Sequence, residues 1–293
     1  MTTTDALGSV AVGYDGTPHS DVALAWAVRH AVALERPLLV IHAVGVPISG
    51  YRAAYGLPED RATPRTAGRA VLDGGLAAAR AIDRSVVLRE HLALGPARDV
   101  LRESASGAHA LVLGSRGHGG LAAYVLGSVS AGVAETAPCP VVVVRSPEHA
   151  NASSEYAGRV VIGLDGTELS QHALAAAFEY ASWDRRPLTV LHAWDEAGQW
   201  RDLDAYPHLA ETNASHTRQV AEALSGFGEK YPDVEVMVRQ EPAEAGEALL
   251  AASRDADLVV VGARGRGDTA AMLLGSVSRR VLERAHCPVM VAR

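Results

Sequence analysis

The chain carries an internal repeat, and this repeat constrains its fold more than any other feature of the sequence. Four blocks of the first half return in the second half in the same order, 148 to 150 residues later. The repeated blocks are Val12–Thr17 with Ile162–Thr167, His42–Ala43 with His192–Ala193, Gly114–Ser130 with Gly262–Ser278, and Ala137–Val141 with Ala285–Val289. A single duplication has too few units for a solenoid, so each copy must fold around its own core. We therefore expect two domains, residues 1–146 and 158–293, joined by a polar connector.

Composition excludes several classes of protein. The chain has 293 residues, 48% of them hydrophobic, and its 27 basic and 34 acidic side chains give a net charge of −7. No run of five basic residues marks a nucleic-acid surface. The longest apolar runs, such as Val141–Val144, are far short of the roughly 20 residues of a membrane span. Residues 1–5 lack the features of a secretion signal, and two cysteines make no disulfide framework, so we expect a cytoplasmic protein without nucleic-acid or membrane partners.

Short apolar runs alternate with stretches of helical periodicity in each copy. In the first copy we expect strands at 10–14, 38–41, 86–92, 110–113 and 141–144, and helices at 20–34, 65–82, 96–106 and 127–136. Continuous Val, Leu and Ile runs predict strands that are buried on both faces of a helix-covered parallel sheet. The predicted fold class is therefore α/β, with two repeated doubly wound domains. Each is expected to be a five-stranded parallel sheet of order 3-2-1-4-5 with helices on both faces.

Glycine-rich loops follow the first and the fourth predicted strand of each copy. In this strand order the two strands are neighbours where the order reverses, and ligands of such sheets bind beyond the carboxyl ends there. The segment Gly127–Ser130 also begins a helix, whose first N–H groups have no partner within the helix and attract anions. Ser128 and Ser130 add hydroxyl donors at the same place. These features predict a phosphate-binding site, although no lysine completes a P-loop and the glycine spacing is not that of a dinucleotide fold.

The pattern Gly-x2-Gly-x9-Gly-Ser resembles that of the universal stress protein family. An early Gly-x-Asp-Gly-Thr and a terminal Cys-Pro-Val strand add to the resemblance, which covers roughly residues 8–145 and 158–292. Two such domains in one chain resemble the tandem actinobacterial members of the family. The resemblance implies ATP, with or without Mg²⁺, as the cofactor, because the ATP-binding branch of the family holds phosphates with this loop.

The same resemblance implies a role for each matching residue. The loop and helix start would hold phosphates, the end of the first strand would face the nucleoside, and the end of the second strand would meet adenine. The implied nucleotide-binding residues of the first copy are Gly13, Asp15, Ala43, Val44, Gly114, Gly117, Gly127, Ser128, Val129 and Ser130. Those of the second copy are Gly163, Asp165, Ala193, Trp194, Gly262, Gly265, Gly275, Ser276, Val277 and Ser278.

One of these positions differs strongly between the copies, because Trp194 replaces Val44. If backbone groups read the adenine, the side chain at this position is free to vary. We therefore expect the Trp194 side chain to lie aside or to stack on the base, and each copy to bind one nucleotide.

Repeated charged residues next to the glycine loop have two possible roles. Arg116 and Arg264 share one loop position, where they either contact phosphate or lie in solvent. His118 and Arg266 stand two residues further on. No metal site is expected, since the one candidate cluster has no counterpart in the first copy and fits a surface loop: Asp202, Asp204 and His208.

Repeated histidines and cysteines are expected to be structural. His42 and His192 end the second strand of each copy, where a hydrogen-bonded structural histidine is the commoner role. Cys139 and Cys287 have no second cysteine or histidine beside them. We expect them to be small buried side chains rather than metal ligands or reactive thiols.

We interpret the chain as a tandem ATP-binding universal stress protein, a stress-response module that acts by binding an adenine nucleotide. No catalytic residue is assigned, because only Asp15 and Asp165 offer carboxylates at the loops, although slow ATP hydrolysis is left open. One alternative is an adenylyl-transfer enzyme, which would need a Ser-Gly-Gly-x-Asp-Ser loop that the first strand does not supply. The other is a nucleotide-free interaction scaffold, which would not need intact glycine loops in both copies.

The last strand of each copy would leave a sheet edge bare. We expect the two copies to pair within the chain through these strands, Val141–Val144 and Val289–Val291. The sequence leaves open whether two chains form a homodimer, and it names no protein partner.

Overall fold

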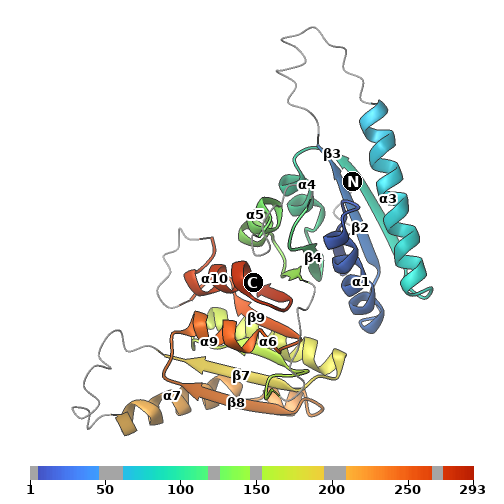
Figure 1. Cartoon of the computed structure of the whole chain (residues 1–293). Helices are drawn as coiled ribbons and strands as arrows, with labels where there is room; N and C mark the ends of the chain where they lie inside the picture. The colour runs from blue at the N-terminus through green and yellow to red at the C-terminus, as the bar shows by residue number, and fades with distance from the viewer. Residues whose placement is uncertain (1–5, 46–61, 118–125, 146–153, 195–208, 266–272) are drawn as a thin grey trace, which may run out of the picture. The chain divides into compact units, whose positions relative to one another are not determined.

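The computed structural model describes residues 6–45, 62–117, 126–145, 154–194, 209–265 and 273–293. It divides into two compact units, Met1–Ser146 and Pro147–Arg293, and each is described by itself (Figure 1). The pairing of the two last strands stays a prediction. Several residues singled out in the sequence lie outside the described residues: His118, Arg266, Asp202, Asp204 and His208.

Strands and helices alternate in both units, as the apolar pattern predicts, except that two helices in succession separate the second and third strands of unit 2. Unit 1 contains β1 (Val10–Gly13), α1 (Pro18–Ala33), β2 (Leu38–Val44), α3 (Ala62–Ile82), β3 (Leu88–Leu94), α4 (Ala97–Ser104), β4 (Ala110–Gly114), α5 (Ser128–Thr136) and β5 (Val141–Val144). Unit 2 contains β6 (Val160–Gly163), α6 (Glu168–Asp184), β7 (Leu188–Ala193), α7 (Leu209–Leu224), α8 (Phe227–Lys230), β8 (Val236–Glu241), α9 (Ala245–Ala252), β9 (Leu258–Gly262), α10 (Ser276–Arg284) and β10 (Val289–Ala292).

The strand order predicted from the sequence is confirmed in both units. It is β3-β2-β1-β4-β5 in unit 1 and β8-β7-β6-β9-β10 in unit 2, and neighbouring strands within each unit are parallel. Val10 of β1 is level with Leu38 of β2 on one side and with Ala110 of β4 on the other. The carboxyl ends of β1, β2 and β4 therefore lie at one edge of the sheet, where ligands of this fold class bind.

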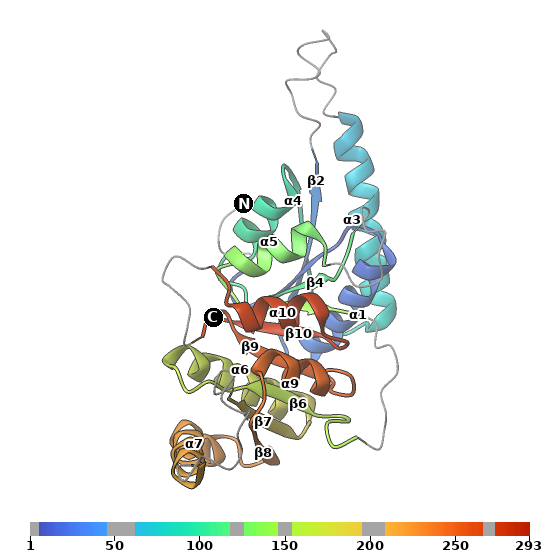
Figure 2. The same cartoon turned by 60° about the vertical axis from the view of Figure 1, so that its left-hand side comes forward.

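Two layers of helices cover each sheet. In unit 1, α1 and α3 contact each other over one face, and α4 and α5 contact each other over the opposite face (Figure 2). In unit 2, α9 and α10 form the corresponding pair. Because both faces are covered, the central strands are buried, and Val10, Val12 and Val112 have no exposed surface.

Several boundaries in unit 1 differ from the expected ones, and β2 ends at Val44 rather than at residue 41. Helix α4 begins at Ala97, because Pro96 is its N-cap with extended backbone rather than its first helical residue. Helix α3 begins at Ala62 rather than at residue 65. Strand β3 covers Leu88–Leu94 rather than 86–92, and Val87 before it is 62% exposed. At this sheet edge burial is partial along the whole strand, so hydrophobic alternation is a weak guide to its ends.

A buried histidine lies at the opposite end of α1 from the carboxyl edge of the sheet. The His30 side chain is 6% exposed, and its ring lies 4.7 Å from the ring of Trp26 and 5.9 Å from that of His109. Burial, together with the charges of His109 and Arg36, lowers the pKa of His30 to about 3. Burial also lowers the pKa of His109 to about 4. Both imidazoles are therefore neutral in the folded protein near neutral pH.

This pair makes unit 1 sensitive to acid. Between the unfolded pKa near 6.5 and the lower folded values, the unfolded chain binds more protons, so stability falls as the pH falls. We expect His30→Phe to flatten this dependence, with about 1–2 kcal/mol less stability lost between pH 6.5 and pH 5 than in the unchanged chain. Melting temperatures measured over this range test the point. Parallel pH profiles for the two proteins would show that His30 titrates normally.

Candidate functional site

The loop after β1 is a hydrogen-bonded turn that starts α1. The Asp15 carboxylate accepts hydrogen bonds from the Thr17 backbone N–H at 3.0 Å and from the Thr17 hydroxyl at 2.6 Å. Thr17 is in turn the N-cap of α1 and accepts from the Ser20 N–H. Gly16 between them has a φ of +79°, which an L side chain rarely adopts. Unit 2 repeats this turn at Asp165, with distances of 2.9 and 2.8 Å.

The start of α5 is fixed to the end of β4. The Gly127 N–H donates to the Ser115 carbonyl at 2.8 Å, and the Ser130 hydroxyl donates to the Gly114 carbonyl at 2.7 Å. Gly127 is the N-cap of α5 and provides no side-chain cap. In contrast to α1, the first-turn N–H groups of α5 therefore have no capping side chain and remain suited to an anion.

The hydroxyl of Ser130, which the sequence predicts as a donor to phosphate, is bonded within the protein. Its single proton is used in the bond to the Gly114 carbonyl. Ser278 does the same in unit 2, donating to the Gly262 carbonyl at 2.6 Å. These two hydroxyl protons are therefore engaged within the protein, whereas the first-turn backbone N–H groups have no capping side chain.

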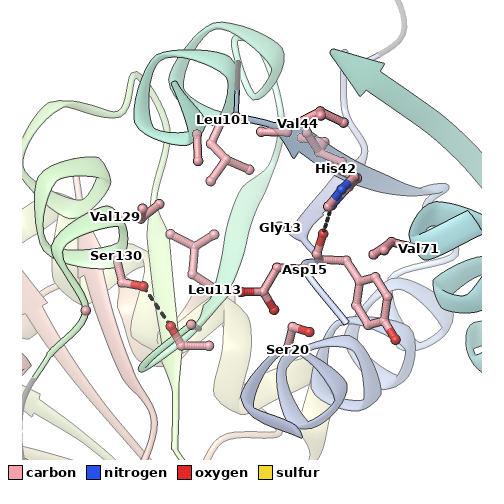
Figure 3. Close-up of a pocket in the computed structure, with 18 of the residues that line it drawn as sticks. Gly13, Asp15, Ser20, His42, Val44, Val71, Leu101, Leu113, Val129 and Ser130 are labelled. Carbon is pink, nitrogen blue, oxygen red and sulfur yellow. Dashed lines mark hydrogen bonds between the residues drawn. The ribbon is translucent and has the colours of Figure 1, made fainter. Parts of the chain in front are cut away.

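A cavity of about 830 Å³ opens at the carboxyl edge of the unit 1 sheet (Figure 3). Its lining joins the helix start to the ends of β1, β2 and β4. All ten predicted residues of unit 1 line it: Gly13, Asp15, Ala43, Val44, Gly114, Gly117, Gly127, Ser128, Val129 and Ser130. Arg116 lines it as well.

Sequence reasoning missed one wall of this cavity, which α3 supplies. Pro64, Ala67, Gly68 and Val71 line it from this helix. They are small or apolar residues on a helix that does not resemble its counterpart in the second copy. Repeat comparison therefore could not find them, and only their spacing on one helical face hints at a shared surface.

Two glycines of the loop motifs are explained by packing rather than by a ligand. A Cβ added to Gly13 would lie 2.6 Å from a methyl group of Leu113. A Cβ added to Gly114 would lie 2.7 Å from the backbone carbonyl oxygen of His19 in α1. At Gly117 the added atom would lie 2.8 Å from a carboxylate oxygen of Asp15, so Asp15 points toward the glycine loop.

A smaller cavity, of about 300 Å³, occupies the equivalent edge of unit 2. Nine of the ten predicted residues line it: Gly163, Asp165, Ala193, Gly262, Gly265, Gly275, Ser276, Val277 and Ser278. Arg264 lines it as Arg116 does in unit 1. The tenth residue, Trp194, is not part of the lining, and its ring stacks on His216 of α7 at 4.4 Å.

The repeated histidines and cysteines have the structural roles expected of them. The Nδ1 atom of His42 lies 2.7 Å from the Tyr14 carbonyl oxygen (Figure 3). The Nδ1 atom of His192 lies 2.7 Å from the Leu164 carbonyl oxygen in unit 2. These bonds tie the end of the second strand to the residue after the first strand in each unit. Cys139 and Cys287 are buried, at 4% and 3% exposure.

Tyr14 places an aromatic ring beside the unit 1 cavity. Its hydroxyl donates to Asp21 at 2.8 Å, and burial and this hydrogen bond raise the pKa of Tyr14 to about 12. The phenol is therefore neutral at physiological pH. Gly75 of α3 faces the ring, and a Cβ there would lie 2.7 Å from it, so this glycine lets α3 pack close to β1.

Comparison with known proteins agrees with this geometry. The model of the universal stress protein family matches residues 7–145 and again residues 157–293. The chain belongs to the universal stress protein family. Among its curated relatives is Universal stress protein Rv2005c of Mycobacterium tuberculosis, 36% identical over 97% of this chain and 96% of the relative. Universal stress protein Rv2623 of the same organism is 35% identical with the same coverage.

A solved structure supports the fold over the whole tandem chain. A universal stress protein from Archaeoglobus fulgidus matches with a TM-score of 0.67, covering 97% of this chain and 98% of its own, at 19% identity. This likeness bears on the fold alone. Within the described segments, no helix is both long and apolar enough to cross a membrane. The same segments hold no group of three or more His, Cys, Asp or Glu side chains arranged for a metal ion.

The surroundings of Gly114 and Gly74 predict opposite effects of an alanine substitution on the free energy of unfolding. Gly114→Ala places a Cβ against the His19 backbone, which cannot rotate away, so we expect a loss of about 1–3 kcal/mol. Gly74→Ala in α3 meets nothing within 4 Å, so the better helix propensity of alanine should stabilise by up to about 1 kcal/mol. Denaturant unfolding of both variants checks the contrast. An unchanged or raised stability in Gly114→Ala would refute the packing explanation.

Proposed function

We propose that unit 1 of this universal stress protein binds an adenine nucleotide, with ATP as the first ligand to test. The observation that carries the proposal is the single cavity that connects the start of α5 to the ends of β1 and β2. One end offers backbone donors, and the other end is apolar. A nucleotide has the same division, with phosphates at one end and a flat base at the other.

The phosphate end of the proposed site is the start of α5. Backbone N–H groups of Ser128, Val129 and Ser130 belong to its first turn, where the helix dipole favours negative charge. Arg98 of α4 donates to the Ser128 carbonyl at 3.1 Å, which brings a guanidinium close to the helix start. Arg116 in the lining adds a second positive charge.

The base end of the proposed site lies between β2 and α3. Ala43 and Val44 end β2, and Ala67, Gly68 and Val71 face them from α3. These side chains are small and apolar, so they leave a slot for a planar ring and can exclude water from its faces. Hydrogen bonds to the base would come from the backbone of β2, as the family resemblance implies.

Asp15 is the carboxylate of the proposed site. One of its oxygens holds the Thr17 turn, and its carboxylate faces the Gly117 loop. We expect Asp15 to meet the ribose or a magnesium ion that accompanies the nucleotide. Binding rather than catalysis is the proposed activity, and in a stress-response protein it would act through occupancy of the site.

A charge at the helix start tests the phosphate end directly. We expect Ser128→Asp to weaken ATP binding at least tenfold, because the exposed carboxylate stands where the phosphates would lie. A carboxylate in the first turn of a helix interacts favourably with the helix dipole. The substitution should therefore not lower the melting temperature of the protein without ligand. Titration calorimetry with ATP measures the effect.

The matched control is Ser225→Asp, which adds the same charge at an exposed residue after α7. It should leave ATP affinity unchanged. If Ser128→Asp binds ATP as tightly as this control, the phosphates do not lie at α5, and the proposed site is wrong.

A further inference from the structure

The two units differ most in the helix that forms the wall of the cavity. Val71 of α3 lies next to Gly16, and Gln219 of α7 lies next to Gly166 in the same turn of unit 2. The two helices therefore correspond at an offset of 148 residues, the same offset as that of the glycine loops. At this offset the counterpart of Gly68 is His216.

His216 stands at the position where unit 1 has no side chain. In unit 1 Gly68 packs directly against Val44, because an added Cβ would overlap a methyl group of Val44 and would lie 3.3 Å from the His42 ring. In unit 2, the imidazole of His216 contacts the equivalents of Val44 and His42, which are Trp194 and His192. Its ring centroid is 4.4 Å from that of Trp194, at an interplanar angle of 16°, and 4.9 Å from that of His192.

A chain of hydrogen bonds holds His216 in this position. His192 uses its Nδ1–H on the Leu164 carbonyl, so its Nε2 accepts in the neutral ring. That Nε2 lies 2.8 Å from Nδ1 of His216, which therefore donates. With one face of its ring stacked on Trp194 and one nitrogen bonded to His192, the imidazole is fixed rather than free to swing away.

The cavity of unit 2 is reduced on this side. Its lining comes from β6, β7, α9, β9 and the start of α10 and their adjoining loops, and includes no α7 residue within the described segments. Unit 1 has four α3 residues in its lining and a volume of about 830 Å³, against about 300 Å³ in unit 2. The space that unit 2 lacks is the slot between β2 and α3 where the base is proposed to lie in unit 1.

The arginine at the contact between the last two helices also differs between the units. In unit 2 it is Arg280 of α10, which pairs with Glu244 at 2.6 Å and with Glu247 at 2.5 Å. In unit 1 it is Arg98 of α4, which donates to the Ser128 carbonyl at the start of α5. Because two carboxylates neutralise the charge of Arg280, it is less available to a phosphate than Arg98.

We infer that His216, held by His192 and Trp194, is a specificity-determining residue that excludes adenine from unit 2. The chain then binds one adenine nucleotide, in unit 1, instead of the two expected from the repeated motifs. Trp194 does not itself fill the cavity; it supports the residue that closes the slot. This inference rests on the proposed function of unit 1.

The stoichiometry of ATP binding, measured by titration calorimetry on the full chain, is the first test. We expect one ATP per unchanged chain, and at least tenfold weaker binding to that one site after Ser128→Asp, which alters only unit 1. Two ATP per unchanged chain would overturn the inference while leaving the proposed function intact. No ATP bound by the unchanged chain would overturn both.

Opening the slot is the second test. His216→Gly with Trp194→Val installs the unit 1 residues, and we expect the stoichiometry to rise from one to two. Adding Ser128→Asp to this variant should leave one ATP, now in unit 2. The control, Arg218→Gly with Trp194→Val, puts the same glycine on an exposed face of α7 and should stay at one.

A second variant, which avoids the low helix propensity of glycine in α7, separates an effect on binding from an effect on folding. His216→Ala with Trp194→Val also removes the imidazole, and its melting temperature shows whether α7 is intact. A folded opened variant that still binds one ATP would overturn the role of His216.

Discussion

The attachment of a helix start to a strand end is the interaction on which the candidate site depends. Two hydrogen bonds, from Gly127 to Ser115 and from Ser130 to Gly114, hold the first turn of α5 above the end of β4. The β1 turn lies beside it, because β1 and β4 are neighbours in the sheet. Without these bonds the backbone donors would have no fixed position relative to Asp15 and β2. Unit 2 has the same bonds, from Gly275 to Ala263 and from Ser278 to Gly262.

The duplication has kept these bonds and changed what surrounds them. The contact between α4 and α5 in unit 1, and between α9 and α10 in unit 2, illustrates this, because an arginine and a glycine have exchanged helices there. In unit 1 Arg98 of α4 lies over Gly132 of α5, whereas in unit 2 Arg280 of α10 lies over Gly246 of α9. One arginine and one glycine fill the contact in both units, with the helices swapped. The exchange of Gly68 for His216 has no such compensation, so it changes the cavity instead.

The sequence was sufficient for the features that repeat. Parallel strands buried on both faces leave continuous apolar runs, and the repeated glycine blocks mark the two strands at the reversal point, so strand order and motif positions could be predicted. The groups that the small residues contact could not be predicted from the sequence. That Gly114 faces the His19 backbone, or that Ser130 bonds to Gly114, depends on distances between elements far apart in the chain. The α3 wall and the Trp194–His216 stack could not be predicted either, because they lie where the two copies no longer resemble each other.

The most direct test of the account asks whether the two ends of the unit 1 cavity bind the two ends of one nucleotide. Backbone amide NMR shifts of the ¹⁵N-labelled chain, recorded with ATP, adenosine and inorganic triphosphate, separate the ends. The account predicts that triphosphate shifts Ser128 and Val129, that adenosine shifts Ala43 and Val44, and that ATP shifts both groups. Equal shifts at Ala43 with ATP and adenosine, with none at the start of α5, would contradict it.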